Sequence, residues 1–303
     1  MSEVVLIRTD HYSSSLDCFV RSIAAQTGRR IIILADESKG ELICPSDIRK
    51  ISLKPSDYGL YATTDVMWRC GDYGLYAALD SVSDASAFWL VEPDVRIHSP
   101  DLGSFFNGTG GSRHIDFVTP WFVPASREWV WYSSMEPYAR QVFNCMMQIC
   151  RISRPAVQYL FTKRRELGNF FISHGLNGAK WPNDEAFVAA SLVEGGFSIG
   201  TLKDHAPSYR TAGTLTFIKP TSLRWLTDLP PNHCIYHPVV EGEKFFQRAV
   251  AYLKAREKTV ANPGQLLQEF DADFAEQIQV ECGSQAVEAF RAEVRDSVRR
   301  FGH

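Results

Sequence analysis

Two uninterrupted apolar runs with an amphipathic segment between them constrain this fold more than any other feature. The first run covers residues 4–7 (VVLI) and the second covers residues 31–35 (IIILA). Residues 16–26 between them carry apolar side chains at helical spacing, with N-cap serines at 13–15 and a stop at Gly28. Strands without polar alternation are typical of a parallel sheet that is covered on both faces. The opening therefore predicts the βαβ unit of an α/β protein.

The rest of the chain continues this pattern. A third apolar run, residues 87–91 (AFWLV), predicts a buried strand that follows a helix over 71–80. We also expect a strand near 116–119, extended segments at 208–220 and 235–240, and helices at 136–166, after 181–185, and at 243–257, 264–280 and 284–300. The prediction is a Rossmann-type, mostly parallel sheet flanked by helices over residues 1–240, with a helical C-terminal appendage over residues 241–303.

Composition excludes several classes of protein. The 303 residues carry a net charge of -3, which is unlike the basic footprint of a nucleic-acid binder. An aromatic content of 12% is too high for a disordered chain. The seven cysteines lack CxxC pairs, which predicts reduced thiols and a cytoplasmic location. The N-terminus is typical of a first strand rather than of a signal peptide, and no apolar run approaches the ~20 residues of a membrane span.

Two carboxylates follow the third apolar run directly. Pro93 lies between Glu92 and Asp94 and cannot donate a ladder hydrogen bond, so regular strand pairing is expected to stop there. The carboxyl ends of parallel strands are where α/β sheets bind ligands. Two neighbouring carboxylates repel each other unless a cation is present, and Mg²⁺ or Mn²⁺ binds such groups together with diphosphate oxygens. The alternative is a strand-ending turn with two solvated acids.

The strand and its carboxylates resemble the DXD-type signature of GT-A glycosyltransferases, from an uncharacterised bacterial branch. The resemblance runs in order over residues 1–240 and rests on four segments: 88–96 (FWLVEPDVR), 68–76 (WRCGDYGLY), 181–187 (WPNDEAF) and 235–239 (IYHPV). It implies an enzyme that transfers a sugar from a nucleotide-sugar donor to a glycan or glycolipid acceptor, in polysaccharide biosynthesis. The sequence departs from DXD by having Glu first, which makes Asp94 the stronger expected ligand.

The resemblance also implies roles for individual residues. Asp94, Glu92 and His237 are expected to bind Mn²⁺ or Mg²⁺, and imidazole is a suitable ligand for Mn²⁺. Asp184 or Glu185 is expected to be the base that takes the acceptor proton. Each residue has a structural alternative. For His237 it is an extended residue before a proline whose ring packs at the surface, and for the two acids it is a first helical turn in which carboxylates satisfy free N–H groups and the helix dipole.

Further residues are expected to contact the donor. Thr9, Asp10 and Asp36 lie at the ends of the first two strands, where GT-A proteins seat the nucleoside, and Glu92 and Asp72 complete the expected set. The alternatives are solvated acids at strand ends and, for Asp72, a simple helix N-cap.

Other features are expected to serve the acceptor or the surface. A cluster of aromatic residues is a candidate acceptor platform, although core packing is the more common role of such residues: Trp121, Phe122, Trp129, Trp131 and Tyr132. The basic run 163–165 (KRR) is typical of a solvated helix face. The last helix combines an apolar stripe with arginines, which is consistent with packing or with peripheral contact at the inner membrane surface: Val287, Phe290, Val294, Val298 and Phe301.

Competing enzyme classes lack their motifs. A dinucleotide-binding dehydrogenase needs GxGxxG after its first strand, and a nucleotidyltransferase usually has a glycine-rich basic loop there. Residues 8–13 (RTDHYS) contain no glycine. A nucleotidyltransferase, or a non-catalytic protein that binds sugar nucleotides on a related fold, remains the alternative to glycosyl transfer.

Overall fold

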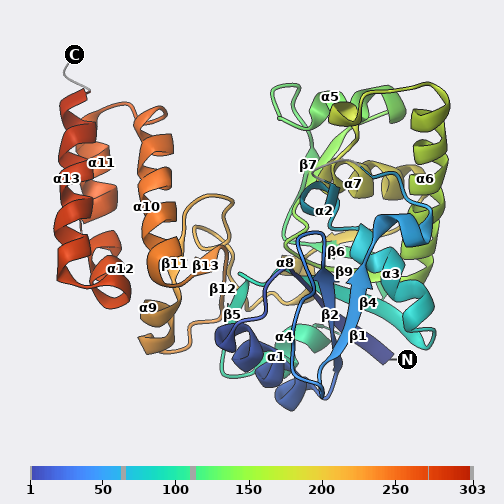
Figure 1. The fold of residues 1–303 in the computed structure, drawn as a ribbon, viewed down its shortest axis with the longest axis horizontal. Coiled ribbons are helices and arrows are strands. Elements are labelled where there is room, and N and C mark those ends of the chain that lie inside the picture. Colours follow the sequence, from blue (N-terminus) through green and yellow to red (C-terminus); the bar gives the residue numbers. More distant parts are fainter. Residues whose placement is uncertain (1, 63–65, 110–113, 272, 301–303) are drawn as a thin grey trace. The chain divides into compact units, whose positions relative to one another are not determined.

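The structure is a computed structural model that describes residues 2–62, 66–109, 114–271 and 273–300 (Figure 1). The chain forms two compact units. The first unit contains Met1–Pro93 and Asp101–Tyr209, and the second contains Asp94–Pro100 and Arg210–His303. Each unit is described by itself below.

The first unit is built around a seven-stranded sheet in the order β10-β6-β9-β4-β1-β2-β3. Its strands are β1 (Ser2–Thr9), β2 (Arg30–Asp36), β3 (Arg49–Leu53), β4 (Ala85–Val91), β6 (Phe117–Thr119), β9 (Ile149–Ser153) and β10 (Ile199–Thr201). All neighbouring pairs are parallel except the two that involve β9, which runs antiparallel to both β4 and β6. The fold class is therefore the predicted one, α/β with a mostly parallel sheet.

The two faces of the sheet bury alternate residues of the same strands. Val4 and Leu6 of β1 belong to a core that includes residues of α3 and α6, whereas Trp89 of β4 contacts Phe105 and Phe106 of α4. Because both faces are covered, strand residues of either parity are apolar, which explains the absence of polar alternation in the sequence. The helices are α1 (Ser14–Thr27), α2 (Val66–Arg69), α3 (Tyr73–Ser81), α4 (Leu102–Asn107), α5 (Tyr132–Met135), α6 (Arg154–Ser173), α7 (Asp184–Glu194) and α8 (Leu202–His205). Strands β7 (Phe122–Pro124) and β8 (Phe143–Cys145) form an antiparallel pair.

The second unit combines small ladders with a helical bundle. An antiparallel ladder joins β5 (Arg96–His98) to β12 (Cys234–Tyr236), and β11 (Thr221–Ser222) runs parallel to β13 (Val239–Val240). Short helix α9 (Leu223–Asp228) precedes β12 in the chain. The bundle contains α10 (Gly242–Glu257), α11 (Pro263–Asp271), α12 (Asp273–Cys282) and α13 (Ser284–Arg300) around a core rich in phenylalanine: Phe245, Phe270, Phe274 and Phe290.

Most predicted elements form, and three regions differ. Residues 208–220, predicted as extended, form isolated bridges at Arg210 and Leu215 and no strand, and the helix predicted over 264–280 is divided into α11 and α12. The βαβ opening has the predicted caps, with Ser13 accepting a hydrogen bond from the Leu16 amide and Gly28 in the left-handed conformation at φ 63°. The helix predicted over 136–166 is wrong in its first half, because β8 and β9 occupy part of that stretch and α6 begins only at Arg154. Strand β3 lies in a stretch that had no predicted element. The division at residue 240 remains a prediction about the extent of a catalytic domain.

No helix within the described ranges combines the length and the apolar character that crossing a lipid bilayer requires. All seven cysteines are free thiols, as their scattered spacing predicts.

Candidate functional site

An ion pair links the carboxyl ends of the two central strands of the first unit. Arg8 lies near the end of β1, and its Nη2 donates to Glu92 Oε1 at 2.7 Å. Its other terminal nitrogen, Nη1, donates to the Met67 carbonyl at 2.6 Å. Burial disfavours the charged guanidinium, but Glu92 and Asp184 outweigh it and raise the pKa of Arg8. Arg8 thus holds Glu92 in place at the ligand-binding end of the sheet.

Asp184 begins helix α7 and is held by two backbone amides. Its Oδ2 accepts from the Gly71 amide at 2.8 Å, and its Oδ1 accepts from the Glu185 amide at 2.8 Å. The N-cap of this helix is Asn183, whose side chain accepts from the Ala186 amide. The side chain of Asp184 therefore points away from the cap position, to the segment that precedes α3.

Glu185 is the second buried acid of the pair. Its side chain is 6% exposed, and Gln148 Nε2 donates to its Oε1 at 3.4 Å. Among the described residues no ion pair with a basic side chain is recorded for Glu185 or for Asp184. A buried carboxylate without a direct cation is costly to ionise.

Burial therefore changes the acidity of both groups. It raises the pKa of Asp184 to about 7, with a further rise from the charge of Asp72, and Arg8 and the Gly71 amide oppose this rise. It raises the pKa of Glu185 to about 8, with a further rise from the charge of Asp184 and opposition from Gln148. Groups with pKa values in this range exchange protons efficiently near neutral pH.

Asp72 has a different environment. Both the Asp72 and the Arg164 side chains are fully buried, and Arg164 donates to Asp72 through Nε at 2.7 Å and through Nη2 at 3.1 Å. The Tyr76 hydroxyl donates to Asp72 Oδ2 at 2.6 Å, and the Arg164 guanidinium lies 3.8 Å from the ring centre of Phe187. Asp72 makes no side-chain cap bond to α3. The predicted donor contact of Asp72 stays untested, and its observed bonds fix α3 to α6.

In the second unit, Asp94 meets His237. Register places Tyr236 of β12 opposite Arg96 of β5, so Asp94 and His237 emerge at the same end of the ladder. His237 Nε2 lies 3.4 Å from Asp94 Oδ1, and Arg248 Nη1 lies 3.2 Å from Asp94 Oδ2. Burial opposes ionisation of Asp94, but the hydrogen bond and charge of His237, with help from Arg248, lower the pKa of Asp94 to about 2.

The tautomer of His237 follows from its other nitrogen. Nδ1 lies 2.5 Å from the Thr216 carbonyl oxygen, which can only accept, so Nδ1 carries the proton. A neutral ring would then direct the lone pair of Nε2 at the carboxylate, and this is repulsive unless a proton or a cation lies between them. A carbonyl on the outer nitrogen is the usual partner of a metal-binding histidine. Asp94 and His237 therefore fit a divalent cation, and Glu92 offers a ligand atom of the same chemical kind.

The other predicted donor residues are distributed over the ends of β1 and β2. Thr9 Oγ1 donates to the His11 carbonyl at 2.6 Å and so orders its own turn. Asp10 is exposed and pairs with Lys39 at 3.4 Å. Asp36 accepts from the Ser38 amide at 3.0 Å. None of these contacts excludes a ligand, and the predicted donor roles of the three residues are not tested by them.

The five aromatic residues of the predicted acceptor platform are all partly buried. Phe122 stacks on Phe143 at 4.8 Å, and Trp129, Trp131 and Tyr132 pack against the core of the first unit. The exposed aromatic of this region is Trp68, which has 71% of its surface accessible.

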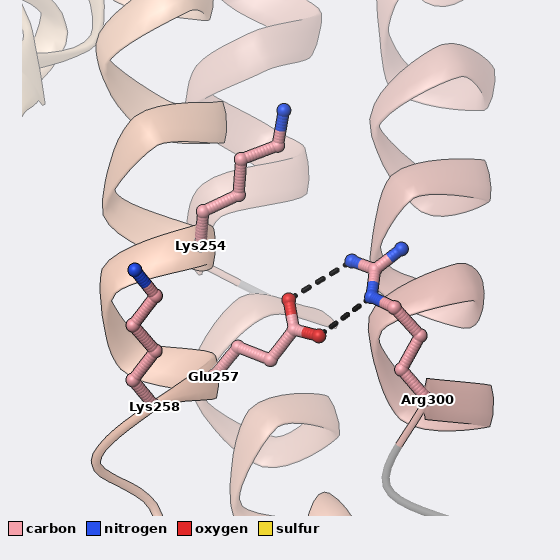
Figure 2. A pocket seen from close by; sticks show the side chains of 4 residues that line it. All are labelled: Lys254, Glu257, Lys258 and Arg300. Carbon is pink, nitrogen blue, oxygen red and sulfur yellow. Dashed lines mark hydrogen bonds and ion pairs between the residues drawn. The ribbon is translucent and has the colours of Figure 1, made fainter. Parts of the chain in front are cut away.

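The last helix buries its apolar stripe inside its own bundle. Val287, Phe290 and Val294 are core residues and Val298 packs against them, while Phe301 lies outside the described residues. Arg300 binds Glu257 of α10 through two hydrogen bonds of 2.6 and 2.9 Å (Figure 2). Lys254 and Lys258 line the same hollow of about 580 Å³. The apolar stripe of α13 therefore packs inside the bundle. Contact with a membrane remains a prediction, and the charged face of the helix would have to make it.

Three residues with a part in these clusters went unnoticed in the sequence. Arg8 is the single basic residue at the end of an otherwise apolar run, and this position was its signal. Gly71 contributes a backbone amide, and Arg248 acts from a helix far along the chain, so neither has a sequence signal of its own.

Comparisons with known proteins identify no family. No family model and no curated protein matches the chain. Among solved structures, the chain is similar to a glycosyltransferase involved in the glycosylation of the major capsid of PBCV-1, with a TM-score of 0.36 and 12% sequence identity. The match covers 69% of this chain and 84% of that protein. A likeness of this size does not identify a family.

Proposed function

We propose that this chain is a metal-dependent glycosyltransferase of the GT-A type, with residues 1–240 as its catalytic region and residues 241–303 as a helical appendage. It would transfer a sugar from a nucleotide-sugar to a glycan or glycolipid acceptor. The observation that carries the proposal is His237, whose Nδ1 is fixed by the Thr216 carbonyl while Nε2 lies 3.4 Å from Asp94 Oδ1. A carbonyl on the outer nitrogen is the usual partner of a metal-binding histidine, which supports a divalent cation between His237 and Asp94.

The metal ligands in this proposal are Asp94 and His237, with Glu92 as a further ligand or as a donor contact. Pro93 alone separates Glu92 from Asp94 in the chain. An arginine holds one oxygen of each acid, Arg8 on Glu92 and Arg248 on Asp94. Asp94 is the stronger proposed ligand because its other oxygen lies 3.4 Å from His237 Nε2. Bound Mn²⁺ or Mg²⁺ would offset the charge of the departing nucleoside diphosphate.

The base in this proposal is Glu185, with Asp184 as its positioning neighbour. Both oxygens of Asp184 accept backbone N–H groups at 2.8 Å, so its orientation is fixed. Glu185 has the higher pKa, about 8, and the bond that it accepts from Gln148 is long, at 3.4 Å. It would take the proton of the acceptor hydroxyl as that oxygen attacks the anomeric carbon. Thr9, Asp10 and Asp36 remain the proposed donor contacts.

The metal assignment is tested by thermal unfolding with UDP-glucose, UDP-galactose, UDP-N-acetylglucosamine, GDP-mannose and CMP-sialic acid, each with and without Mn²⁺. We expect one nucleotide to raise the melting temperature only when Mn²⁺ is present. Asp94→Ala should abolish this shift, while Asp228→Ala, which removes an exposed acid of α9, should preserve it. The absence of a shift with every nucleotide contradicts the proposal.

The base assignment is tested by release of the nucleoside diphosphate from the donor identified in that screen. Glu185→Gln should retain the metal-dependent shift and lose turnover. Donor binding without turnover in the unmodified chain, across acceptors and pH, would favour the non-catalytic alternative. Release of pyrophosphate from a sugar phosphate and a nucleoside triphosphate would instead identify a nucleotidyltransferase.

A further inference from the structure

An exposed tryptophan and a partly buried one lie together on the first unit. Trp68 of α2 is 71% exposed, and its ring centre lies 6.2 Å from that of Trp131 at an interplanar angle of 60°. Val130, next to Trp131 in the chain, is also 71% exposed. Single exposed apolar residues are normal, but a grouped set that includes a large indole indicates a binding surface.

The surface is held by an arginine. The Arg69 guanidinium lies 5.2 Å from the ring centre of Trp131, within the range of a cation–π contact. Arg69 also donates to the carbonyls of Gly178 and Ala179 at 3.4 Å each, and to that of Trp181. Trp131 is therefore packed against a guanidinium that is fixed from a different part of the chain, which gives the indole pair a defined geometry before any ligand binds.

The segment that carries Trp68 is bonded directly to the carboxylate cluster. One residue before Trp68, the Met67 carbonyl accepts from Arg8, which also binds Glu92. Three residues after it, the Gly71 amide donates to Asp184. The exposed indole thus belongs to a short stretch that bonds to Arg8, the partner of Glu92, and to Asp184, the neighbour of the proposed base.

We propose that Trp68 and Trp131 form an acceptor subsite that binds a pyranose ring of a carbohydrate by stacking. The inference rests on the proposed function. One face of many pyranoses carries only C–H groups while the hydroxyls lie at the rim, so a wide indole covers the apolar face and leaves the rim to polar partners. Arg69 and the Arg127–Glu136 ion pair lie on the same chain segments as the two indoles.

The experiment uses the full-length protein, tagged and displayed multivalently on a printed array of pyranose oligosaccharides. We expect retention on at least one class of glycan. Trp68→Ala and Trp131→Ala should each weaken that retention about tenfold or more, because each removes a stacking ring, and Trp68→Phe should keep most of it. Ile43→Ala is the matched control, since Ile43 is 84% exposed and lies outside these contacts. It should bind as the unmodified chain does.

Two results overturn the inference: no glycan retained by the unmodified chain, or unchanged retention by Trp68→Ala and Trp131→Ala. Circular dichroism melting of each variant excludes loss of fold as the reason for weak binding. The metal-dependent nucleotide shift separates this inference from the proposed function. Trp68→Ala should keep that shift. Glycan retention that depends on Trp68 in a chain without any nucleotide shift contradicts glycosyl transfer and leaves the carbohydrate subsite standing.

Discussion

Two buried acidic clusters in the first unit show that buried aspartates can have opposite roles. Asp72 is fully buried and meets Arg164 through two hydrogen bonds and Tyr76 through a third. Asp184 is also buried, but its partners are backbone amides, and Arg8 is directed to Glu92 and the Met67 carbonyl instead. The first acid is neutralised by a dedicated cation. The second shares its surroundings with Glu185 and is left hard to ionise.

The difference teaches what to look for in a buried carboxylate. A fully paired acid stabilises one arrangement of helices. An acid pair with pKa values of about 7 and 8 costs stability when charged and can take up a proton. The contrast predicts that changes at Asp72 act on folding, whereas changes at Glu185 act on chemistry.

The largest expected effect comes from breaking the paired cluster. Asp72→Asn leaves the Arg164 guanidinium buried without a counter-charge, which should lower the free energy of unfolding by about 3–5 kcal/mol. Urea denaturation followed by tryptophan fluorescence measures this loss.

The partner of that experiment is the double variant Asp72→Asn with Arg164→Met. It removes both charges and should recover a large part of the stability. Lys163→Met is the control, because Lys163 is exposed and forms a surface ion pair with Glu166 at 2.8 Å, so its loss should change stability by less than about 0.5 kcal/mol. If Arg164→Met alone loses no more stability than Lys163→Met, Arg164 is not the buried partner of Asp72.

The second expected effect is a pH dependence of stability that comes from the unpaired acids Asp184 and Glu185. The pKa of Asp184 is raised from 3.8 to about 7, and that of Glu185 from 4.5 to about 8. The folded state therefore holds protons that the unfolded chain releases, so the unfolding free energy contains a contribution that is complete below pH 4 and is lost as pH rises to 8. We expect the unfolding free energy to fall by several kcal/mol across this range, because one unit of pKa shift corresponds to about 1.4 kcal/mol. Glu185→Gln with Asp184→Asn should flatten the profile. Equally steep profiles in both proteins would contradict the raised pKa values.

The fold was largely predictable because its central strands are buried on both faces. Runs such as 31–35 contain only apolar residues, and the intervening helix carries its own caps. The region 136–153 was not predictable in this way. Strand β9 is five residues long and lies between β4 and β6, so pairing with residues distant in sequence selects strand over helix there. Strand β3 occupies an edge of the sheet and has a weak apolar pattern of its own.

The site was predictable in its residue types and not in its electrostatics. The position of Asp94 after a buried strand marked it as a candidate ligand, but its contact with His237 depends on the register of β5 against β12. The raised pKa of Asp184 depends on Asp72, 112 positions away in the chain. Arg164 was predictable from spacing. It shares its helix face with the buried residues Leu160, Gly168 and Phe171 of α6, and the basic run 163–165 concealed this.

A third effect, of intermediate size, is expected from an added methyl group at Gly71, which would crowd Asp184. A Cβ at Gly71 would lie 2.7 Å from Asp184 Oδ2 and 3.3 Å from Arg8 Nη1, so one of these groups must move in Gly71→Ala. We expect a loss of about 1–2 kcal/mol in stability and roughly tenfold slower turnover. Steady-state kinetics with the identified donor measures the rate. In an Asp184→Asn background the added methyl should have little further effect on the rate of turnover. A full additional tenfold loss there would show that the methyl group does not act through Asp184.

The smallest expected effect on stability is at an acid that faces solvent. Asp10 pairs with Lys39 at 3.4 Å, and both side chains are more than half exposed. Because water screens such pairs, Asp10→Asn should change the unfolding free energy of the ligand-free chain by less than about 0.5 kcal/mol. If Asp10 contacts the donor, the same substitution should still shrink the nucleotide-dependent rise in melting temperature, and we expect that outcome. A full-sized rise in Asp10→Asn would remove Asp10 from the donor contacts. An acid that matters to the ligand and not to the fold is the mirror image of Asp72, so this pair of variants measures how far the two roles are separated along one chain.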